Sequence, residues 1–256
     1  WRLGQGIDLD NLTDARTQFI DVNADGLLDA VYVKSENDKT YGSYVVSKLR
    51  VRYLERDTSK ATSSSTYYRF GPEQVYTQEG INSIELKGGA GDFNGDGRLE
   101  VVATVVGFTA QGLREGYEAL SLRETSGVRT LDAYAFGISV YTKEEKVLTA
   151  DLNGDGLTDV VYATGTPGND YNWHYRLANG VSFEAARALG AFDEQATPQF
   201  IDLNSDGRAD LVWHDNDEKR TYVRYAQNEN GTGVLQFAST VTTIAYSSAS
   251  PTFLDL

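Results

Sequence analysis

Sixteen oxygen-bearing side chains recur in one spacing along the chain, and residues of these types bind hard metal cations. Segments 21–29, 92–100, 151–159 and 202–210 each carry Asp at position 1, Asn at position 3, Asp at position 5 and Asp or Glu at position 9. These side chains are Asp21, Asn23, Asp25, Asp29, Asp92, Asn94, Asp96, Glu100, Asp151, Asn153, Asp155, Asp159, Asp202, Asn204, Asp206 and Asp210. A mixed oxygen shell without His or Cys suits Ca²⁺ better than Mg²⁺, which demands octahedral geometry and keeps its water. The sequence therefore predicts about four Ca²⁺ sites.

Positions 6 and 7 complete the proposed ligand set. Position 6 is always glycine, as a sharp turn with a positive φ requires, and this turn lets the carbonyl of position 7 face inward. That carbonyl would come from Leu27, Arg98, Leu157 and Arg208, whose side chains we expect to point away. Four bound ions would change the formal charge from −14 to −6.

Two other interpretations compete with this one. An EF-hand needs a bidentate Glu at position 12 and flanking helices, whereas position 12 is Tyr32, Ala103, Tyr162 and Trp213. Positions 10 to 12 look like the starts of β-strands, so the EF-hand is excluded. A polar Asx-type turn without metal explains any single copy, but four copies in register favour the metal site.

The repeat also predicts the elements that position these loops. The first Asp of each unit lies at 21, 92, 151, 202 and 255, a period typical of propeller blades of four short strands. We therefore expect an all-β fold, a β-propeller of four-stranded blades with Ca²⁺-binding hairpin loops. Residues 1–256 would form one propeller region of about four blades with partial blades at each end, the fifth repeat being truncated at 255. An insertion at 59–66 is expected to be an exposed loop, and one at 111–127 a short helix or a long hairpin.

Composition limits the partners. A formal charge of −14 and a pI near 4.5 disfavour nucleic acid and anionic membranes as partners. No apolar run reaches the roughly 18 residues of a membrane span, so no membrane insertion is expected. The chain lacks Cys and Met and begins at Trp1, which suggests a piece of a larger protein.

Residues 200–212 (FIDLNSDGRADLV) and 151–161 (DLNGDGLTDVV) resemble FG-GAP/VCBS repeats, the calcium-loop blades known from integrin α-subunits. The resemblance covers nearly the whole chain and implies a propeller whose hairpin loops hold Ca²⁺ through the sixteen side chains above. The second loop departs from the pattern with Ala90 two residues before its first Asp and with Glu100 at position 9. Residues 159–164 and 173–180 are further similar to propellers of bacterial toxin-complex B subunits and Rhs-type secreted proteins. In those proteins the propeller is implied to be a docking or gating module.

The sequence carries no catalytic signature, and we expect the chain not to be an enzyme. His174 and His214 fall at different places in the repeat. Recurrent aromatic residues at position 12, and others on nearby strands, fit packing between blades better than sugar stacking.

The predicted function is a protein-docking or scaffold module of a larger secreted or surface protein, with a bacterial toxin as one candidate. The partner would be another protein or the rest of the parent chain. A carbohydrate-binding lectin or adhesin with a glycan partner is the first alternative, and an accessory domain of a polysaccharide-degrading enzyme is the second. An extracellular location is expected because millimolar calcium fills loops of modest affinity there.

Overall fold

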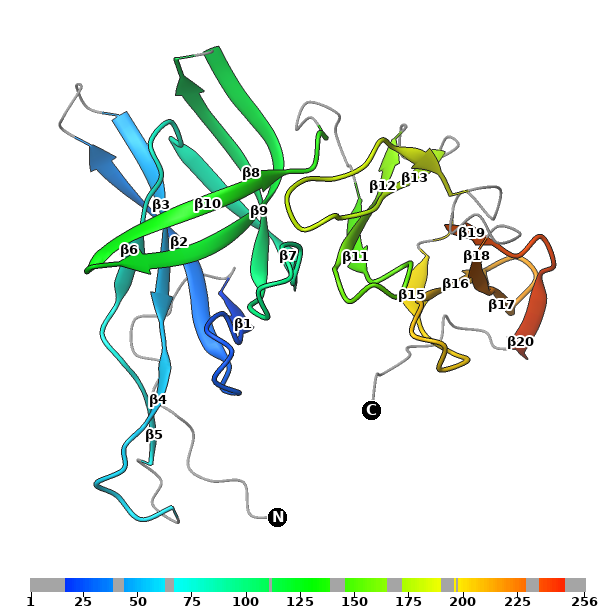
Figure 1. Cartoon of the computed structure of the whole chain (residues 1–256), viewed down its shortest axis with the longest axis horizontal. Coiled ribbons are helices and arrows are strands. Elements are labelled where there is room, and N and C mark those ends of the chain that lie inside the picture. Colours follow the sequence, from blue (N-terminus) through cyan, green and yellow to red (C-terminus); the bar gives the residue numbers. More distant parts are fainter. Residues whose placement is uncertain are drawn as a thin grey trace. The chain divides into compact units, whose positions relative to one another are not determined.

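The computed structural model describes residues 17–38, 44–62, 67–110, 112–138, 146–164, 172–189, 196, 198–228 and 235–246. All regular elements in these ranges are β-strands, as expected from the sequence (Figure 1). Among these residues, no helix has the length and apolar character needed to cross a membrane. The predicted partial blades at the two ends, including the truncated repeat at 255, lie outside the described residues. The chain divides into two compact units, Trp1–Ala90 with Gly97–Ser139, and Gly91–Asp96 with Val140–Leu256.

The first unit contains two four-stranded sheets. The first sheet has the order β1-β2-β3-β6, formed by β1 (Gln18–Ile20), β2 (Asp29–Asp38), β3 (Tyr44–Arg52) and β6 (Gln74–Tyr76). The second has the order β10-β9-β8-β7, formed by β7 (Ser83–Gly91), β8 (Glu100–Thr109), β9 (Gly112–Thr125) and β10 (Val128–Ala135). Between β3 and β6 the chain leaves the sheet and forms a small hairpin of β4 (Leu54–Arg56) and β5 (Tyr68–Phe70).

Apolar side chains from both sheets form the core of this unit. Leu49 and Val51 alternate along β3 and are fully buried, as a strand with one core-facing side requires. They belong to the same buried cluster as Val101 of β8 and Leu120 of β9. Burial of this shared face stabilises the two sheets as one body.

The second unit repeats the arrangement. Its first sheet has the order β11-β12-β13-β14, formed by β11 (Val147–Ala150), β12 (Asp159–Thr164), β13 (Asn172–Arg176) and β14 (Arg187–Ala188). Its second has the order β15-β16-β17-β20, formed by β15 (Gln199–Ile201), β16 (Asp210–Asp215), β17 (Arg220–Arg224) and β20 (Thr242–Tyr246). A small hairpin of β18 (Ala226–Asn228) and β19 (Leu235–Phe237) lies between β17 and β20 in the chain. Its core contains more aromatic residues, including Trp173, Tyr175, Trp213 and Phe237.

Each of the four acidic segments therefore belongs to one four-stranded sheet, which is consistent with the blades of a β-propeller. Of the two structures expected for residues 111–127, the long hairpin is confirmed and the helix is wrong. In Figure 1, β8 and β9 are the long paired strands of the first unit, and β10 pairs with β9 through a tight turn at Ser126 and Gly127. Both turn residues have positive φ (53° and 81°), the backbone shape that joins two twisted strands in a two-residue turn. In the other insertion, residues 59–62 are exposed, and 63–66 lie outside the described residues.

One close backbone contact fixes where β8 lies. A Cβ at Gly107 would be 1.7 Å from the carbonyl oxygen of Gly80, so any side chain there forces the two segments apart. The neighbouring residue is held by a hydrogen bond from the amide of Asn82 to the carbonyl of Val106, at 2.9 Å.

Gly107→Ala is therefore expected to lower the free energy of unfolding by about 1–3 kcal/mol, the usual cost of forcing an extra carbon into a packed site. Gly71→Ala is the matched control, because its added Cβ would meet only the side chain of Glu55, which can move. We expect that control to change stability by less than about 0.5 kcal/mol in urea denaturation. Equal effects of the two substitutions would contradict the close contact.

Candidate metal centre in four acidic hairpin loops

All four acidic segments are hairpin loops that join the first and second strands of a sheet in chain order. They connect β1 to β2, β7 to β8, β11 to β12 and β15 to β16, and we call them loops 1 to 4. Position 9 of each loop is the first residue of the second strand. The prediction that these segments run into strands and not into helices is confirmed.

Two positions in each loop adopt a left-handed backbone. The glycines at position 6 have φ between 80° and 85°, which confirms the requirement expected from the sequence. Position 4 is also left-handed, with φ of 59° at Ala24 and Ser205 and 76° at Gly95 and Gly154. Sequence reasoning missed this second turn, although small residues at position 4 of every loop were a signal for it.

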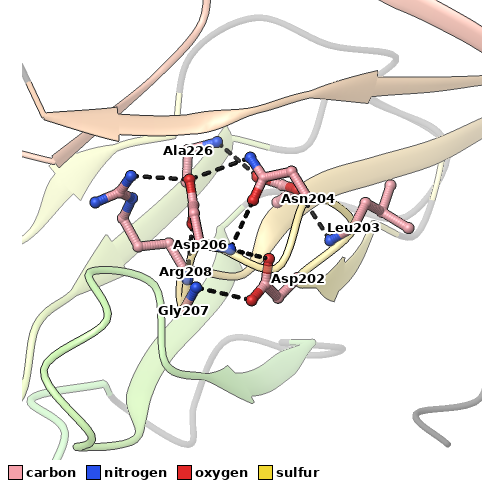
Figure 2. A network of polar contacts seen from close by, with 8 residues as sticks. Asp202, Leu203, Asn204, Asp206, Gly207, Arg208 and Ala226 are labelled. Carbon is pink, nitrogen blue, oxygen red and sulfur yellow. Dashed lines mark hydrogen bonds and ion pairs between the residues drawn. The ribbon is translucent and has the colours of Figure 1, made fainter.

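The side chains at positions 1, 3 and 5 hold the loop backbone (Figure 2). In loop 4, the carboxylate of Asp202 accepts hydrogen bonds from the amides of Asp206 at 3.1 Å and Gly207 at 2.8 Å. The Oδ1 atom of Asn204 accepts the Asp206 amide at 3.0 Å, and Oδ1 of Asp206 accepts the Arg208 amide at 3.0 Å. The three side chains therefore surround a single backbone turn.

Loop 1 repeats this network, and loop 3 differs from it in one bond, because Oδ1 of Asp151 accepts the amide of position 4 (Gly154, 2.7 Å) instead of position 5. The amide at position 6 donates to the position 1 carboxylate at 2.8 Å in loop 1 and 2.9 Å in loop 3, and the amide at position 7 donates to the position 5 carboxylate at 2.8 Å in both. Loop 2 has the contact of the Gly95 amide with Asp92 at 2.6 Å, as in loop 3, and that of the Asp96 amide with Asn94 at 2.8 Å, as in the other three loops.

The acidic side chains at position 9 are fully buried, with an exposed fraction of 0% at Asp29, Glu100, Asp159 and Asp210. In loop 3, Asp159 accepts the amide of Leu152 on Oδ2 at 2.9 Å and the amide of Ala178 on Oδ1 at 2.8 Å. The corresponding donors are Val22 and Leu54 for Asp29, and Leu203 and Ala226 for Asp210. Each of these three carboxylates thus ties position 2 of its loop to the chain just beyond the third strand.

Burial has a measurable electrostatic consequence for these groups. It raises the pKa of Asp159 to about 7 and the pKa of Asp29 to about 6, and it raises the pKa of Asp210 as well. The two backbone amides at each carboxylate act in the opposite direction, because they stabilise the charged form.

An arginine near the end of the third strand works with the position 9 carboxylate. The Nε atom of Arg52 donates to the carbonyl of Gly71 at 3.0 Å, and Nε of Arg224 donates to the carbonyl of Ala238 at 2.6 Å. In the third sheet, Nη1 of Arg176 donates to the carbonyl of Glu184 at 3.3 Å. In each case the residue two positions later donates its amide to position 9. Both groups therefore hold the base of a segment that leaves the sheet.

We call these segments excursions; they comprise residues 54–70, 178–183 and 226–237. The second sheet has none, because β9 continues past this point to Thr125. In the second sheet, Leu120 of the third strand lies opposite Val101, which is position 10 of its loop. In the other three sheets the residue opposite position 10 is an arginine, namely Arg52, Arg176 or Arg224. Position 9 of loop 2 is also Glu instead of Asp. Sequence reasoning noticed Glu100 but missed the arginines, which align once the repeats are superimposed.

Backbone hydrogen bonds join consecutive loops within the second unit, to which residues Gly91–Asp96 at the start of loop 2 also belong. The amide of Thr158 in loop 3 donates to the carbonyl of Asp92 in loop 2 at 2.7 Å. In the same way the amide of Ala209 in loop 4 donates to the carbonyl of Asp151 in loop 3 at 2.9 Å. Position 8 of one loop is thus fixed to position 1 of the preceding loop.

The side chain at position 7 covers position 4 of the preceding loop. A Cβ added to Gly95 would lie 3.0 Å from Cδ2 of Leu157, and one added to Gly154 would lie 3.1 Å from Cγ of Arg208. We expected all position 7 side chains to point away from their own loops. For Arg208 this was wrong, because its guanidinium turns back and pairs with Asp206 at 2.8 Å.

The donor chemistry of the loops fits a hard cation. Each loop offers carboxylates, an Asn oxygen and a main-chain carbonyl, and the carboxylate oxygens bonded to amides keep further lone pairs. Among the described residues, no three His, Cys, Asp or Glu side chains come together as a metal cluster. A site here would therefore depend on the Asn and carbonyl oxygens as well as on the acids. The twenty predicted ligand positions remain a prediction.

The other residues singled out from the sequence lie in the sheets. The aromatic side chains at position 12, Tyr32, Tyr162 and Trp213, are 5–7% exposed, so they pack and leave little surface for a ligand. Nδ1 of His214 contacts Oγ1 of Thr221 at 3.0 Å, and this histidine is buried. His174 contacts Thr164 at 3.4 Å, and burial lowers its pKa.

Comparison with known proteins identifies the repeat in one part of the chain. Residues 151–213, from position 1 of loop 3 to the middle of β16, match the family model of the FG-GAP-like repeat. No curated protein matches the sequence. The match supports an FG-GAP repeat family and a propeller-type fold.

The buried carboxylate of Asp159 predicts a pH dependence for the metal-free protein. Its pKa of about 7 in the folded state exceeds the value of 3.8 for an unburied Asp, so its stabilising contribution is complete below pH 3.8 and is lost as the pH rises through about 7. In metal-free buffer, the stability of the wild type relative to Asp159→Asn should rise as the pH falls from 7.5 to 4.5, by at most about 1.4 kcal/mol per pH unit.

Urea denaturation at several pH values measures this difference. The Asp159→Asn variant should also be less stable at every pH, by about 1–3 kcal/mol. The side-chain NH₂ group of Asn is a donor, so one of the two backbone amides that Asp159 accepts would lose its acceptor. Parallel pH profiles for the two proteins would show that this carboxylate does not titrate in that range.

Proposed function

We propose that this chain is a noncatalytic, calcium-stabilised propeller segment that serves as a docking scaffold within a larger secreted or surface protein. The observation that carries the calcium part of the proposal is the repetition of one loop geometry. Loops 1, 3 and 4 place the oxygens of positions 1, 3 and 5 around the same backbone turn through the same hydrogen bonds. Independent polar turns have no reason to share these contacts.

Calcium would act as a strut at each loop. The position 1 and 5 carboxylates bring two negative charges to one turn, and a dication there removes their mutual repulsion. The position 9 carboxylate lies at the base of the same loop and is bonded to the third strand through a backbone amide. An ion held by the loop would therefore stabilise the first three strands of a sheet together.

A docking role fits the surface better than a catalytic one. Phe108 and Leu113 are neighbours across the β8–β9 pair and are 69% and 51% exposed. The two adjacent apolar side chains offer a small contact surface that a partner could cover. Both histidines are engaged with threonine hydroxyls within the sheets, which supports a role outside catalysis.

The secreted location and the toxin candidate rest on other grounds. Extracellular calcium near the millimolar range would keep loops of modest affinity filled. The resemblance to toxin-complex and Rhs-type propellers favours a parent protein of that kind. The lectin alternative is less well supported, because the position 12 aromatics that would stack sugars are buried.

Calcium should raise the thermal stability of the chain. Each filled site adds about 2.7 kcal/mol to the free energy of unfolding when free calcium is 100 times its dissociation constant. Melting curves with excess calcium and with chelator should therefore differ clearly, and elemental analysis should find about four Ca²⁺ per chain. Magnesium at the same concentration is the control and should give a smaller shift. Coincident melting curves together with a calcium-free protein would refute the proposal.

A glycan array probed with the chain in calcium-containing buffer separates docking from sugar binding. We expect no glycan to bind above background, because the recurrent aromatic rings are covered. Saturable binding of one glycan class, lost on substitution of an exposed aromatic such as Phe108→Ser, would favour the lectin instead.

A further inference from the structure

Loop 4 contains a positively charged side chain that pairs with one of its carboxylates. Its position 7 is Arg208, whereas loops 1 and 3 have Leu27 and Leu157 there. The Nη2 atom of Arg208 lies 2.8 Å from Oδ2 of Asp206, the position 5 carboxylate of the same loop (Figure 2). The two side chains are only 24% and 28% exposed, so water screens this pair less than it screens one on an open surface.

The paired oxygen is the one that the equivalent loops leave more open. Oδ1 of Asp206 accepts the backbone amide of Arg208, and Oδ2 accepts both the guanidinium and Nδ2 of Asn204 at 3.1 Å. The corresponding Oδ2 atoms in loops 1 and 3 also accept a hydrogen bond from the Asn amide, at 3.1 Å and 2.9 Å. Among the described residues, no ion pair reaches Asp25 or Asp155. Loop 4 thus has a neutralising partner that loops 1 and 3 lack.

The arginine is also anchored. Its Cγ lies where a Cβ on Gly154 would approach within 3.1 Å, so the methylene groups rest on position 4 of loop 3. The next residue, Ala209, donates its amide to the carbonyl of Asp151 in loop 3 at 2.9 Å. Both contacts limit how far the guanidinium can withdraw from Asp206.

We propose that Arg208 is a built-in counter-ion that sets the calcium affinity of loop 4. This inference rests on the proposed function, in which the loops bind calcium. A dication at loop 4 must displace the guanidinium from Asp206 or bind beside its positive charge, and either event weakens binding. Loop 4 therefore fills after loop 3 and keeps its shape without metal, whereas loops 1 and 3 depend on the ion.

The size of the effect follows from the pair. A half-buried ion pair and the repulsion between a monocation and a dication in a wet loop together correspond to roughly a tenfold change in the dissociation constant. Calcium titration in competition with a chromophoric chelator resolves stepwise constants of that spacing. Loop 2 also has an arginine, Arg98, at position 7, so the step of loop 4 is identified by a variant and not by its rank. Asp202→Ala removes position 1 of loop 4 and should delete one step that is weaker than that of loop 3, which assigns that step to loop 4.

The decisive variant is Arg208→Leu, which gives loop 4 the residue of loops 1 and 3. The step assigned to loop 4 should tighten by about tenfold, and the chelated protein should melt at a lower temperature because the counter-ion of Asp206 is gone. Arg208→Lys keeps the charge and should stay close to the wild type in both measurements. Leu157→Arg is the reciprocal variant, and it should weaken one of the tighter steps.

The outcomes separate the two proposals. If no variant binds calcium, the proposed function fails, and this inference fails with it. If the wild type binds calcium but Arg208→Leu leaves every step unchanged, only the counter-ion role is refuted. A purely structural role for Arg208 would lower the melting temperature equally with calcium and with chelator, and it would leave the affinity unchanged.

Discussion

The fold depends on a carboxylate that is buried at the start of the second strand of each sheet. In three of the four sheets its two oxygens accept amides from opposite directions, one from its own loop and one from the chain beyond the third strand. A buried amide without a partner costs more than a typical hydrogen bond contributes, so this one side chain satisfies two donors that no strand pairing reaches. The carboxylate therefore joins the loop, the second strand and the exit of the third strand.

The second sheet lacks this arrangement of carboxylate, arginine and excursion. Its position 9 residue is Glu100, its third strand carries Leu120 where the others carry arginine, and its third and fourth strands are joined by a two-residue turn. The three differences occur together. Where no excursion leaves the sheet, the arginine that holds its base has no carbonyls to bind, and an apolar residue packs in its place. An acidic residue is nevertheless present at position 9 of the second sheet. Its role in the loop therefore does not depend on an excursion.

The sequence predicted the fold and the loops because both are expressed in a short repeating pattern. Asp, Asn and Gly at fixed positions identify the hairpin loops, and the strand-forming residues after position 9 identify the second strand. The contacts beyond the repeat unit were harder to foresee. The bond from Ala209 to Asp151 and the turn of Arg208 toward Asp206 depend on how consecutive units stack, which no single repeat encodes. The arginines of the third strands were visible in the sequence, but their carbonyl partners lie in segments of different length and no alignment exposes them.

The excursions differ greatly in length while their bases stay the same. Residues 178–183 make a minimal turn, whereas residues 54–70 form a hairpin with its own pair of strands. Asp159 and Asp29 hold the starts of these two segments through equivalent hydrogen bonds. The structure of the sheet therefore does not depend on the length of the segment that follows. Segments of very different length are therefore compatible with the same kind of sheet. The same property makes the turn at 178–183 a suitable acceptor site for a grafted peptide, displayed on a base whose geometry is already fixed.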